Sequence, residues 1–253
     1  MADILRLLKK ISYALKWRIR VVFNRGGSYG RIALSNTWIG DGFATTHDVG
    51  FLRNEKFIAA FEGSLESISD KKVISTCKEI IWRAYICSWG AKQALALGGD
   101  FIELGVWHGV ISKTVVDFVD FSKEDARLYL VDSWGAMPGG HKSESYAEDI
   151  FEEVSSKFLV YPNVELIRGV VPEVLPKIPT KCVAYLAIDM NGWEAELASL
   201  EHFYPLMKSG GFIYFDDYGY GYPKLREVVN DFFEDKPETI LILPTGQAVV
   251  IKI

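Results

Sequence analysis

The stretch VAYLAIDMNGWEAELASLEHFYPLMKSGGFIYFDD covers residues 183–217 and contains a short apolar run near each end. The first run is followed by one aspartate, Asp189, and the second by two, Asp216 and Asp217. The runs at 183–188 and 211–215 have the length and composition of strands buried on both faces, and the segment 194–208 between them is predicted to be a helix. Because parallel strands need a crossover connection, this stretch predicts a strand–helix–strand unit of a parallel sheet.

The same alternation continues on both sides of this unit. Further strands are expected at 100–104, 128–132, 164–168, 239–243 and 247–252, and helices at 71–97, 110–120, 145–158 and 223–234. The last two strands are separated only by Pro244-Thr245-Gly246, which is too short for a parallel crossover, so an antiparallel hairpin is expected. The predicted fold class is α/β: a Rossmann-like, doubly wound sheet, mostly parallel, with a C-terminal antiparallel hairpin and an N-terminal helical extension.

The N-terminal region differs in composition from the rest of the chain. Residues 1–25 hold seven Lys or Arg and one acid, and their apolar residues recur at helical spacing, which predicts a basic amphipathic helix. Such a helix suits peripheral contact with an anionic membrane through residues 1–23, or docking on the domain or on a second subunit. Residues 26–97 are expected to form an N-terminal loop and helical cap, and residues 98–253 the main domain. Irregular loop is expected over residues 24–56.

Composition excludes several functional classes. The formal net charge is −5, and residues 1–25 hold seven basic residues against one acid, so the remainder of the chain is clearly acidic and broad nucleic-acid binding is not expected. Cys77, Cys87 and Cys182 lie in apolar runs, which predicts reduced, buried thiols rather than disulfides or zinc ligands. No apolar run approaches the roughly 20 residues of a spanning helix, and no signal peptide is recognisable. A cytoplasmic protein is expected, with the option of a peripheral position on the inner face of the cell membrane.

A glycine-containing segment closes the first strand of the main domain. Glu103-Leu104-Gly105 ends this strand, and Gly109 follows where a helix opens, so the backbone can turn tightly and approach a nucleotide-like ligand. Trp107 stands where a dinucleotide-binding loop needs a further glycine, and its bulk would crowd a pyrophosphate. S-adenosylmethionine carries no phosphate and is therefore favoured over NAD.

Residues at the ends of the next two strands complete the expected cofactor site. Asp132, followed by Ser133, ends the second strand, where a carboxylate can accept hydrogen bonds from both ribose hydroxyls. The alternative is that Asp132 only caps the following turn. Gly169 and Val170 come after the third strand, where backbone groups commonly flank an adenine ring, although a plain turn explains them equally well.

Three aspartates follow the fourth and fifth strands: Asp189 ends the fourth, and Asp216 and Asp217 end the fifth. Because ligands bind outside the carboxyl ends of parallel strands, these carboxylates are expected to converge, and a hard divalent cation would offset their repulsion. Adjacent strand residues point to opposite faces, so Asp216 and Asp217 can share a metal only if the strand ends before them. The alternative is an exposed acidic strand end without a metal.

Five blocks between about Phe101 and the C-terminus carry a family resemblance. They read FIELGVWHG, LYLVDSWGAMP, ELIRGVVPEVLP, AYLAIDMNGWEAELASLEHFYPLMKSGGFIYFDDYG and KLREVV. Together they resemble the macrocin O-methyltransferase (TylF) family, bacterial enzymes that methylate sugar hydroxyls with S-adenosylmethionine and magnesium. The resemblance implies a metal site of Asp189, Asp216 and Asp217 and cofactor contacts by Glu103, Gly105 and Asp132. The implied acceptor is a sugar hydroxyl of a glycolipid, polysaccharide or glycosylated metabolite.

The sequence departs from the family pattern at Asn191, where an acid is usual, and at His108, where Arg is common. The amide of Asn191 is still able to ligate or orient a sugar hydroxyl, so the departure concerns the substrate more than the reaction. Asp189 is the candidate base for the hydroxyl proton, and His108 or His141 is the metal-independent alternative, although a lone histidine is more often structural. His141 also lies in a segment expected to cover the substrate. Tyr218 suits either stacking on a sugar ring or surface packing.

Two other functional classes stay open. One is a catalytically inactive, cofactor-binding scaffold at a membrane surface, and the other, which Trp107 disfavours, is a nicotinamide-dependent oxidoreductase. Metal-dependent consumption of S-adenosylmethionine would separate an enzyme from a scaffold. The expected partner is a small-molecule or glycan substrate, and the residues leave open both its identity and whether the chain forms a homo-oligomer.

Overall fold

The computed structural model describes residues 37–135, 149–221 and 223–253. The chain divides into two compact units, one ending at Arg53 and the other running from Asn54 to Ile253. The predicted helix at 1–25 and His141 lie outside the described residues. Within those residues, no helix is both long and apolar enough to cross a membrane.

The first unit contains a small hairpin where the sequence suggested irregular loop. Strands β1 (Trp38–Gly40) and β2 (Phe43–Thr45) pair antiparallel, and a short 3-10 helix, η1, covers Gly50–Arg53. Asp41 and Gly42 form the turn with φ values of 47° and 70°, the conformation that an Asp-Gly pair favours in two-residue hairpin loops. The loop prediction is therefore wrong over these residues, although the Asp-Gly signal was present in the sequence.

Three helices open the second unit: α3 (Glu55–Leu65), α4 (Lys71–Glu79) and α5 (Ile81–Leu95). The Asn54 side chain caps α3 by accepting from the backbone N–H of Phe57, and Asp70 caps α4 in the same way. The single helix predicted from 71 to 97 is wrong, because the chain leaves helical geometry at Ile80, where φ is −93° and ψ is 16°. This break starts α5 in a new direction, and α5 then packs on the sheet.

Seven strands form the sheet of this unit. They are β3 (Asp100–Leu104), β4 (Leu128–Asp132), β5 (Val164–Arg168), β6 (Val183–Ile188), β7 (Met207–Phe215), β8 (Leu241–Ile242) and β9 (Ala248–Ile251). Their spatial order is β5-β4-β3-β6-β7-β9-β8. The first five run parallel, whereas β9 pairs antiparallel with both β7 and β8. The mostly parallel sheet with a C-terminal antiparallel hairpin is thus confirmed.

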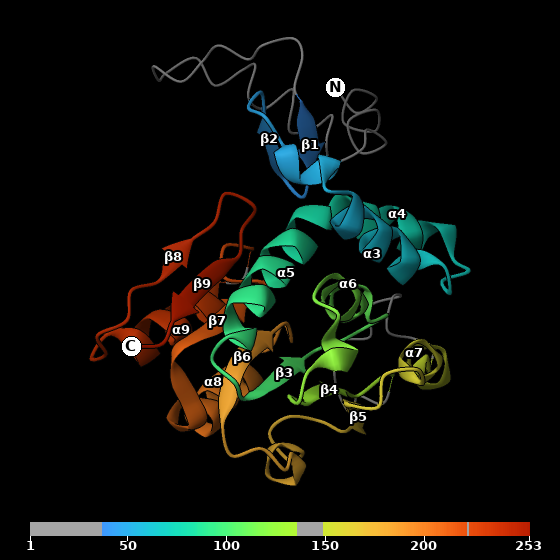
Figure 1. Cartoon of the computed structure of the whole chain (residues 1–253). Helices are drawn as coiled ribbons and strands as arrows, with labels where there is room; N and C mark the ends of the chain where they lie inside the picture. Colours follow the sequence, from blue (N-terminus) through green and yellow to red (C-terminus); the bar gives the residue numbers. More distant parts are fainter. Residues whose placement is uncertain (1–36, 136–148, 222) are drawn as a thin grey trace, which may run out of the picture. The chain divides into compact units, whose positions relative to one another are not determined.

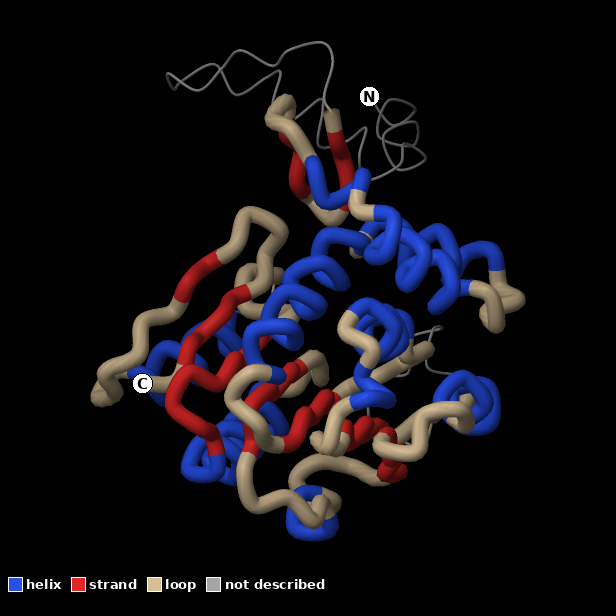
Figure 2. The backbone as a smooth tube through the Cα atoms, in the orientation of Figure 1, coloured by secondary structure: helices blue, strands red, loops and turns tan. Residues whose placement is uncertain are grey.

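Helices cover both faces of the sheet, as a doubly wound fold requires (Figures 1 and 2). The connections after β3 contribute α6 (Val110–Phe118), α7 (Phe151–Phe158), α8 (Trp193–Phe203) and α9 (Pro223–Phe233), with short 3-10 turns at Phe121–Lys123 and Leu175–Lys177. One core cluster joins the sheet to α5, α6 and α7, and the other joins it to α8 and α9.

The helix predicted at 194–208 is shorter in the structure. It ends at Phe203, a 3-10 turn covers Tyr204–Leu206, and β7 already begins at Met207. Pro205 explains the early end, since its ring lacks the N–H group that continues a helix. β6 and β7 pair in parallel with Ile188 opposite Phe215, so their carboxyl ends are adjacent, and the residues that follow them form the candidate site.

Candidate active site

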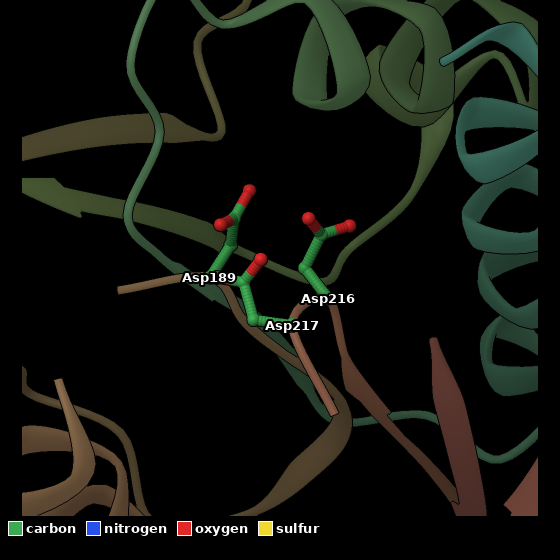
Figure 3. Close-up of side chains that lie close together, drawn as sticks. All are labelled: Asp189, Asp216 and Asp217. Atoms are coloured by element: carbon green, nitrogen blue, oxygen red, sulfur yellow. The ribbon is translucent and has the colours of Figure 1, made fainter. Parts of the chain in front are cut away.

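Three aspartates meet beyond the carboxyl ends of β6 and β7. Asp189 follows β6, and Asp216 and Asp217 follow β7, which ends at Phe215 before both of them. One carboxylate oxygen of each residue lies within 4.8 Å of the others, and Figure 3 shows the three side chains extending toward a common space. The end of β7 removes the alternation of side chains that would otherwise separate Asp216 from Asp217.

Asp216 is held by groups from two elements. Its side chain is buried, the Tyr214 hydroxyl donates to Oδ1 at 2.6 Å, and the Arg83 guanidinium on α5 forms an ion pair with Oδ2. Arg83 also donates from Nη2 to the Tyr220 hydroxyl at 2.6 Å, and its guanidinium lies 4.9 Å from the centre of that ring. The described part of the site thus combines three acids with a buried cation.

Mutual repulsion and burial both act on these acids. Burial raises the pKa of Asp189 well above its usual range, the neighbouring Asp216 and Asp217 carboxylates add to this, and Arg83 opposes it. Glu196, in the first turn of α8, is only 3% exposed, and burial followed by the charges of Asp217 and Asp216 raises its pKa to about 8. Such a concentration of carboxylate oxygens fits the ligand preference of magnesium and other hard divalent cations.

The Gly105 loop, which follows β3 and is predicted to bind a cofactor, lies directly against the acidic cluster. Gly105, just after β3, has φ +86°, and a Cβ atom at this position would lie 1.7 Å from the backbone oxygen of Asp189. The backbone N–H of Asp189 donates to the carbonyl of Leu104 at 2.8 Å. Only glycine fits this contact, so the loop predicted to bind a cofactor and the residue predicted to bind a metal are neighbours.

Asp132 forms hydrogen bonds to the Gly105 loop. Its Oδ2 accepts from the backbone N–H groups of Val106 at 2.7 Å and Trp107 at 2.8 Å, and its Oδ1 accepts from Trp134 N–H at 2.9 Å and from the Ser133 hydroxyl at 3.4 Å. The carboxylate is thus engaged within the protein. The ribose contact predicted for Asp132 stays a prediction, and the structure adds a role in shaping the loop.

Two tryptophans fix this loop in an unusual backbone conformation. Trp107 and Trp134 have φ values of 48° and 45°, in the left-handed region that non-glycine residues rarely adopt. The Trp134 indole N–H donates to the Trp107 carbonyl at 3.0 Å. In a dinucleotide-binding loop this position is usually glycine, which adopts left-handed geometry easily. Trp107 has the same left-handed geometry with a bulky side chain.

Other predicted cofactor residues gather at the same edge of the sheet. Glu103 is buried in β3, and burial, opposed by Ser112 and increased by Asp216 and Asp132, raises its pKa to about 8. Gly109 precedes α6 in the left-handed conformation. The N–H of Gly169 donates to the backbone oxygen of Asp132 at 2.9 Å, so the end of β5, followed by Val170, lies beside the end of β4.

The predicted substrate contacts and candidate bases differ in their surroundings. Asn191 is exposed with φ 55°, whereas Tyr218 is buried in the core and donates from its hydroxyl to Asn230 at 2.7 Å. The burial of Tyr218 favours packing over stacking on a sugar. His108 is also buried, with Nδ1 2.8 Å from Glu153, which favours a structural role. His141 cannot be placed, because it lies outside the described residues.

Sequence reasoning missed Arg83 and Glu196. Arg83 is the sole charged residue between Ile80 and Ala91, and an isolated charge in an apolar helical run is a signal of a buried ion pair. Its partner is 133 residues away, so the sequence offered no way to name it. Glu196 lies among helix residues with no such contrast, because Glu194 and Glu201 are exposed acids of the same segment.

Comparison with known proteins gives one family match and several relatives. The model of the family described as macrocin-O-methyltransferase (TylF) matches residues 92–240. A curated relative is "8-demethyl-8-(2,3-dimethoxy-alpha-L-rhamnosyl)-tetracenomycin-C 4'-O-methyltransferase" of Streptomyces olivaceus, 27% identical over 152 residues that cover 53% of this chain and 58% of that protein. Another is mycinamicin III 3''-O-methyltransferase of Micromonospora griseorubida, 25% identical over 211 residues that cover 74% of this chain and 80% of that protein.

A solved structure gives the same fold. The O-methyltransferase NovP superposes with a TM-score of 0.59 at 21% sequence identity, covering 68% of this chain and 80% of that chain. The chain spans only 58% of the length of the tetracenomycin methyltransferase, compared with 80% of the mycinamicin methyltransferase. The family match contains the three aspartates, Gly105 and Asp132, whereas Arg83 lies before its first residue.

Proposed function

Because this chain belongs to the macrocin O-methyltransferase (TylF) family, we propose that it transfers a methyl group from S-adenosylmethionine to a sugar hydroxyl with the help of a divalent cation. The observation that carries the proposal is the direct contact between the Gly105 loop and Asp189. A methyl donor bound at that loop and a hydroxyl bound at the acidic cluster would be neighbours. Proximity and alignment of this kind account for a large part of the rate of a two-substrate reaction.

The charge of the site supports S-adenosylmethionine over a nicotinamide dinucleotide. Asp189, Asp216 and Asp217 lie just beyond the ends of two adjacent strands, and the charges of Asp217 and Asp216 also act on Glu196. A sulfonium cation is attracted to such a surface, while a pyrophosphate is repelled by it. Trp107 in place of a glycine further limits the approach of a pyrophosphate to the loop.

The acidic cluster has the donor set of a magnesium site, and Asp189, Asp216 and Asp217 are the residues that would hold the ion. When bound, a divalent cation lowers the pKa of a hydroxyl that it ligates. Asp189 is proposed to accept the hydroxyl proton, since its carboxylate lies in the acidic cluster and its backbone contacts the Gly105 loop, so that a hydroxyl bound there would lie beside it. Asp216 is anchored by Tyr214 and Arg83, so the cluster is rigid on that side.

Sugar-bearing small molecules are the proposed acceptors. One relative is named as a methyltransferase of a rhamnosylated tetracenomycin, and this supports a glycosylated metabolite as the substrate class. Asn191, exposed beside Asp189, is proposed to bind the acceptor. Residues 1–23 and His141 are not required by this proposal, and a membrane or catalytic role for them remains a separate prediction.

The proposal is tested with purified full-length chain, S-adenosylmethionine, magnesium and a panel of methyl rhamnosides and rhamnosylated metabolites. Mass spectrometry should detect S-adenosylhomocysteine together with one added methyl group on an acceptor sugar. Asp189→Asn should abolish transfer, and Asp235→Asn, an exposed acid paired with Lys236, serves as the matched control. A chain that binds S-adenosylhomocysteine but methylates no sugar would favour the scaffold hypothesis instead.

A further inference from the structure

Arg83 is a buried cation that the packing of α5 fixes beside the acidic cluster. The buried residues of α5 include Arg83, Cys87, Gly90 and Ala91, which share one face of the helix. A Cβ atom at Gly90 would lie 2.5 Å from the Phe212 ring, so α5 approaches β7 as closely as glycine allows. Arg83 is two turns before Gly90, and the same packing therefore sets its position at the end of β7.

The role of Arg83 is not explained by orientation of Asp216 alone. Tyr214 holds Oδ1 of Asp216 at 2.6 Å, and the backbone N–H of Asp216 donates to the Ile188 carbonyl at 3.0 Å. These two contacts fix the residue on the strand end without the guanidinium. What Arg83 adds is a permanent positive charge, because a guanidinium does not lose its proton in proteins.

The charge of the cluster makes that addition consequential. Asp189, Asp216 and Asp217 bring their oxygens within 4.8 Å of one another, and such a group repels itself when no cation is present. The Arg83 guanidinium, paired with Asp216, offsets part of this negative charge at one of the carboxylates that would hold a divalent ion.

We propose that Arg83 is the resident counter-cation of the acidic cluster, paired with Asp216 at the end of β7 and acting on the metal through that carboxylate. It stabilises the cluster in the metal-free chain, and it weakens metal binding because it already offsets part of the negative charge that attracts the ion. A site with less negative charge favours release of a proton from a bound hydroxyl more than a site with more negative charge does. This inference rests on the proposed function, because it assumes that the cluster binds a divalent ion.

Arg83 also contacts Tyr220, in the loop that follows Asp217. Tyr220 accepts from Arg83 at 2.6 Å and stacks below its guanidinium, while about two fifths of the residue remains exposed. Arg83 therefore ties the segment that follows Asp217 to α5. This contact depends on the planar guanidinium, whereas the electrostatic role depends only on the charge, so the two roles separate in a lysine variant.

The test measures Mn²⁺ binding to the metal-free, full-length chain by titration calorimetry. Arg83→Gln keeps a hydrogen-bond donor but removes the charge, and we expect it to bind Mn²⁺ about tenfold more tightly. Its metal-free thermal midpoint should fall, and Mn²⁺ should raise that midpoint more than it does in the wild type. Arg83→Lys should restore an affinity within about threefold of the wild type. Arg127→Gln, an exposed arginine paired with Glu165 at 3.7 Å, is the matched control.

The outcomes separate this inference from the proposed function. Equal or weaker Mn²⁺ binding by folded Arg83→Gln, with binding by the wild type, would overturn the role of Arg83 and leave the metal site intact. If neither protein binds Mn²⁺, the metal site and the counter-cation are both wrong. If Arg83→Gln does not fold, the same titration with Arg83→Met decides, and tighter binding is again the expected result.

Discussion

Replacing Gly105 by alanine would place a Cβ atom 1.7 Å from the backbone oxygen of Asp189. Cβ atoms essentially never approach such an atom within 3.0 Å, so the loop or the Asp189 backbone must move by about 1.3 Å, the difference between these distances. The new side chain would also have to adopt φ +86°, which costs a non-glycine residue about 1–2 kcal/mol.

This displacement should affect both halves of the site. Moving Asp189 separates it from Asp216 and Asp217, and moving the loop changes the surface proposed to hold the cofactor. Because a misplacement of about 1 Å can lower a rate about 100-fold, we expect turnover to fall by at least that factor. Mn²⁺ and S-adenosylhomocysteine should both bind more weakly in calorimetry.

Gly98→Ala is the matched control. Gly98 has φ +62°, so alanine suffers similar backbone strain, but no atom lies within 4 Å of the added Cβ. Urea unfolding should show a loss of about 1–2 kcal/mol in this variant, with unchanged binding of both ligands. If Gly105→Ala behaves like Gly98→Ala in stability, ligand affinity and turnover, the argument that the loop and Asp189 are in contact is refuted.

The cofactor loop, the buried acid beside it and the N-terminal segment each allow a separate test. Asp132→Asn should weaken S-adenosylhomocysteine binding by about 1–3 kcal/mol, because an amide nitrogen cannot accept the N–H bonds that shape the loop; an unchanged calorimetric affinity would remove this role. Burial raises the pKa of Glu103 to about 8, so the folded chain keeps a proton that the unfolded chain loses above 4.5, and stability should fall as pH rises through this window. Glu103→Gln should reduce that fall in urea unfolding of cofactor-free chain at pH 5 and pH 8, and a variant with the wild-type slope would contradict the assignment. Deleting residues 1–23 should abolish sedimentation with anionic vesicles at low salt, where attraction is least screened, and a full-length chain that ignores such vesicles excludes the membrane hypothesis.

The sheet was predictable because its signals are local. Each parallel strand is a short apolar run, and the three-residue connection after Leu243 leaves no room for a crossover, so both the parallel sheet and the final hairpin could be read from the sequence. The convergence of Asp189 with Asp216 followed from the rule that parallel strands end at one edge. Element ends were less accurate: Ile80 divides one predicted helix, and Pro205 shortens another.

The neighbours of the site residues could not be predicted in this way. Arg83 reaches Asp216 from a helix that begins far earlier in the chain, and only the packing of α5 on β7 brings them together. Asp132 lies at the end of β4 as expected, but its partners are backbone N–H groups. Because nearly every residue carries such a group, the sequence does not show which ones Asp132 will contact. Positions of polar groups along strands are thus encoded locally, whereas their partners depend on tertiary packing.

The divalent ion proposed to bind at Asp189, Asp216 and Asp217 should be required for methyl transfer. The most direct measurement is the rate of S-adenosylhomocysteine formation from a rhamnosylated acceptor by chain stripped of metal, with elemental analysis of the same preparation. We predict no turnover in chelator, recovery on addition of magnesium, and retained S-adenosylhomocysteine binding throughout. Full turnover by a preparation that contains no metal would contradict it.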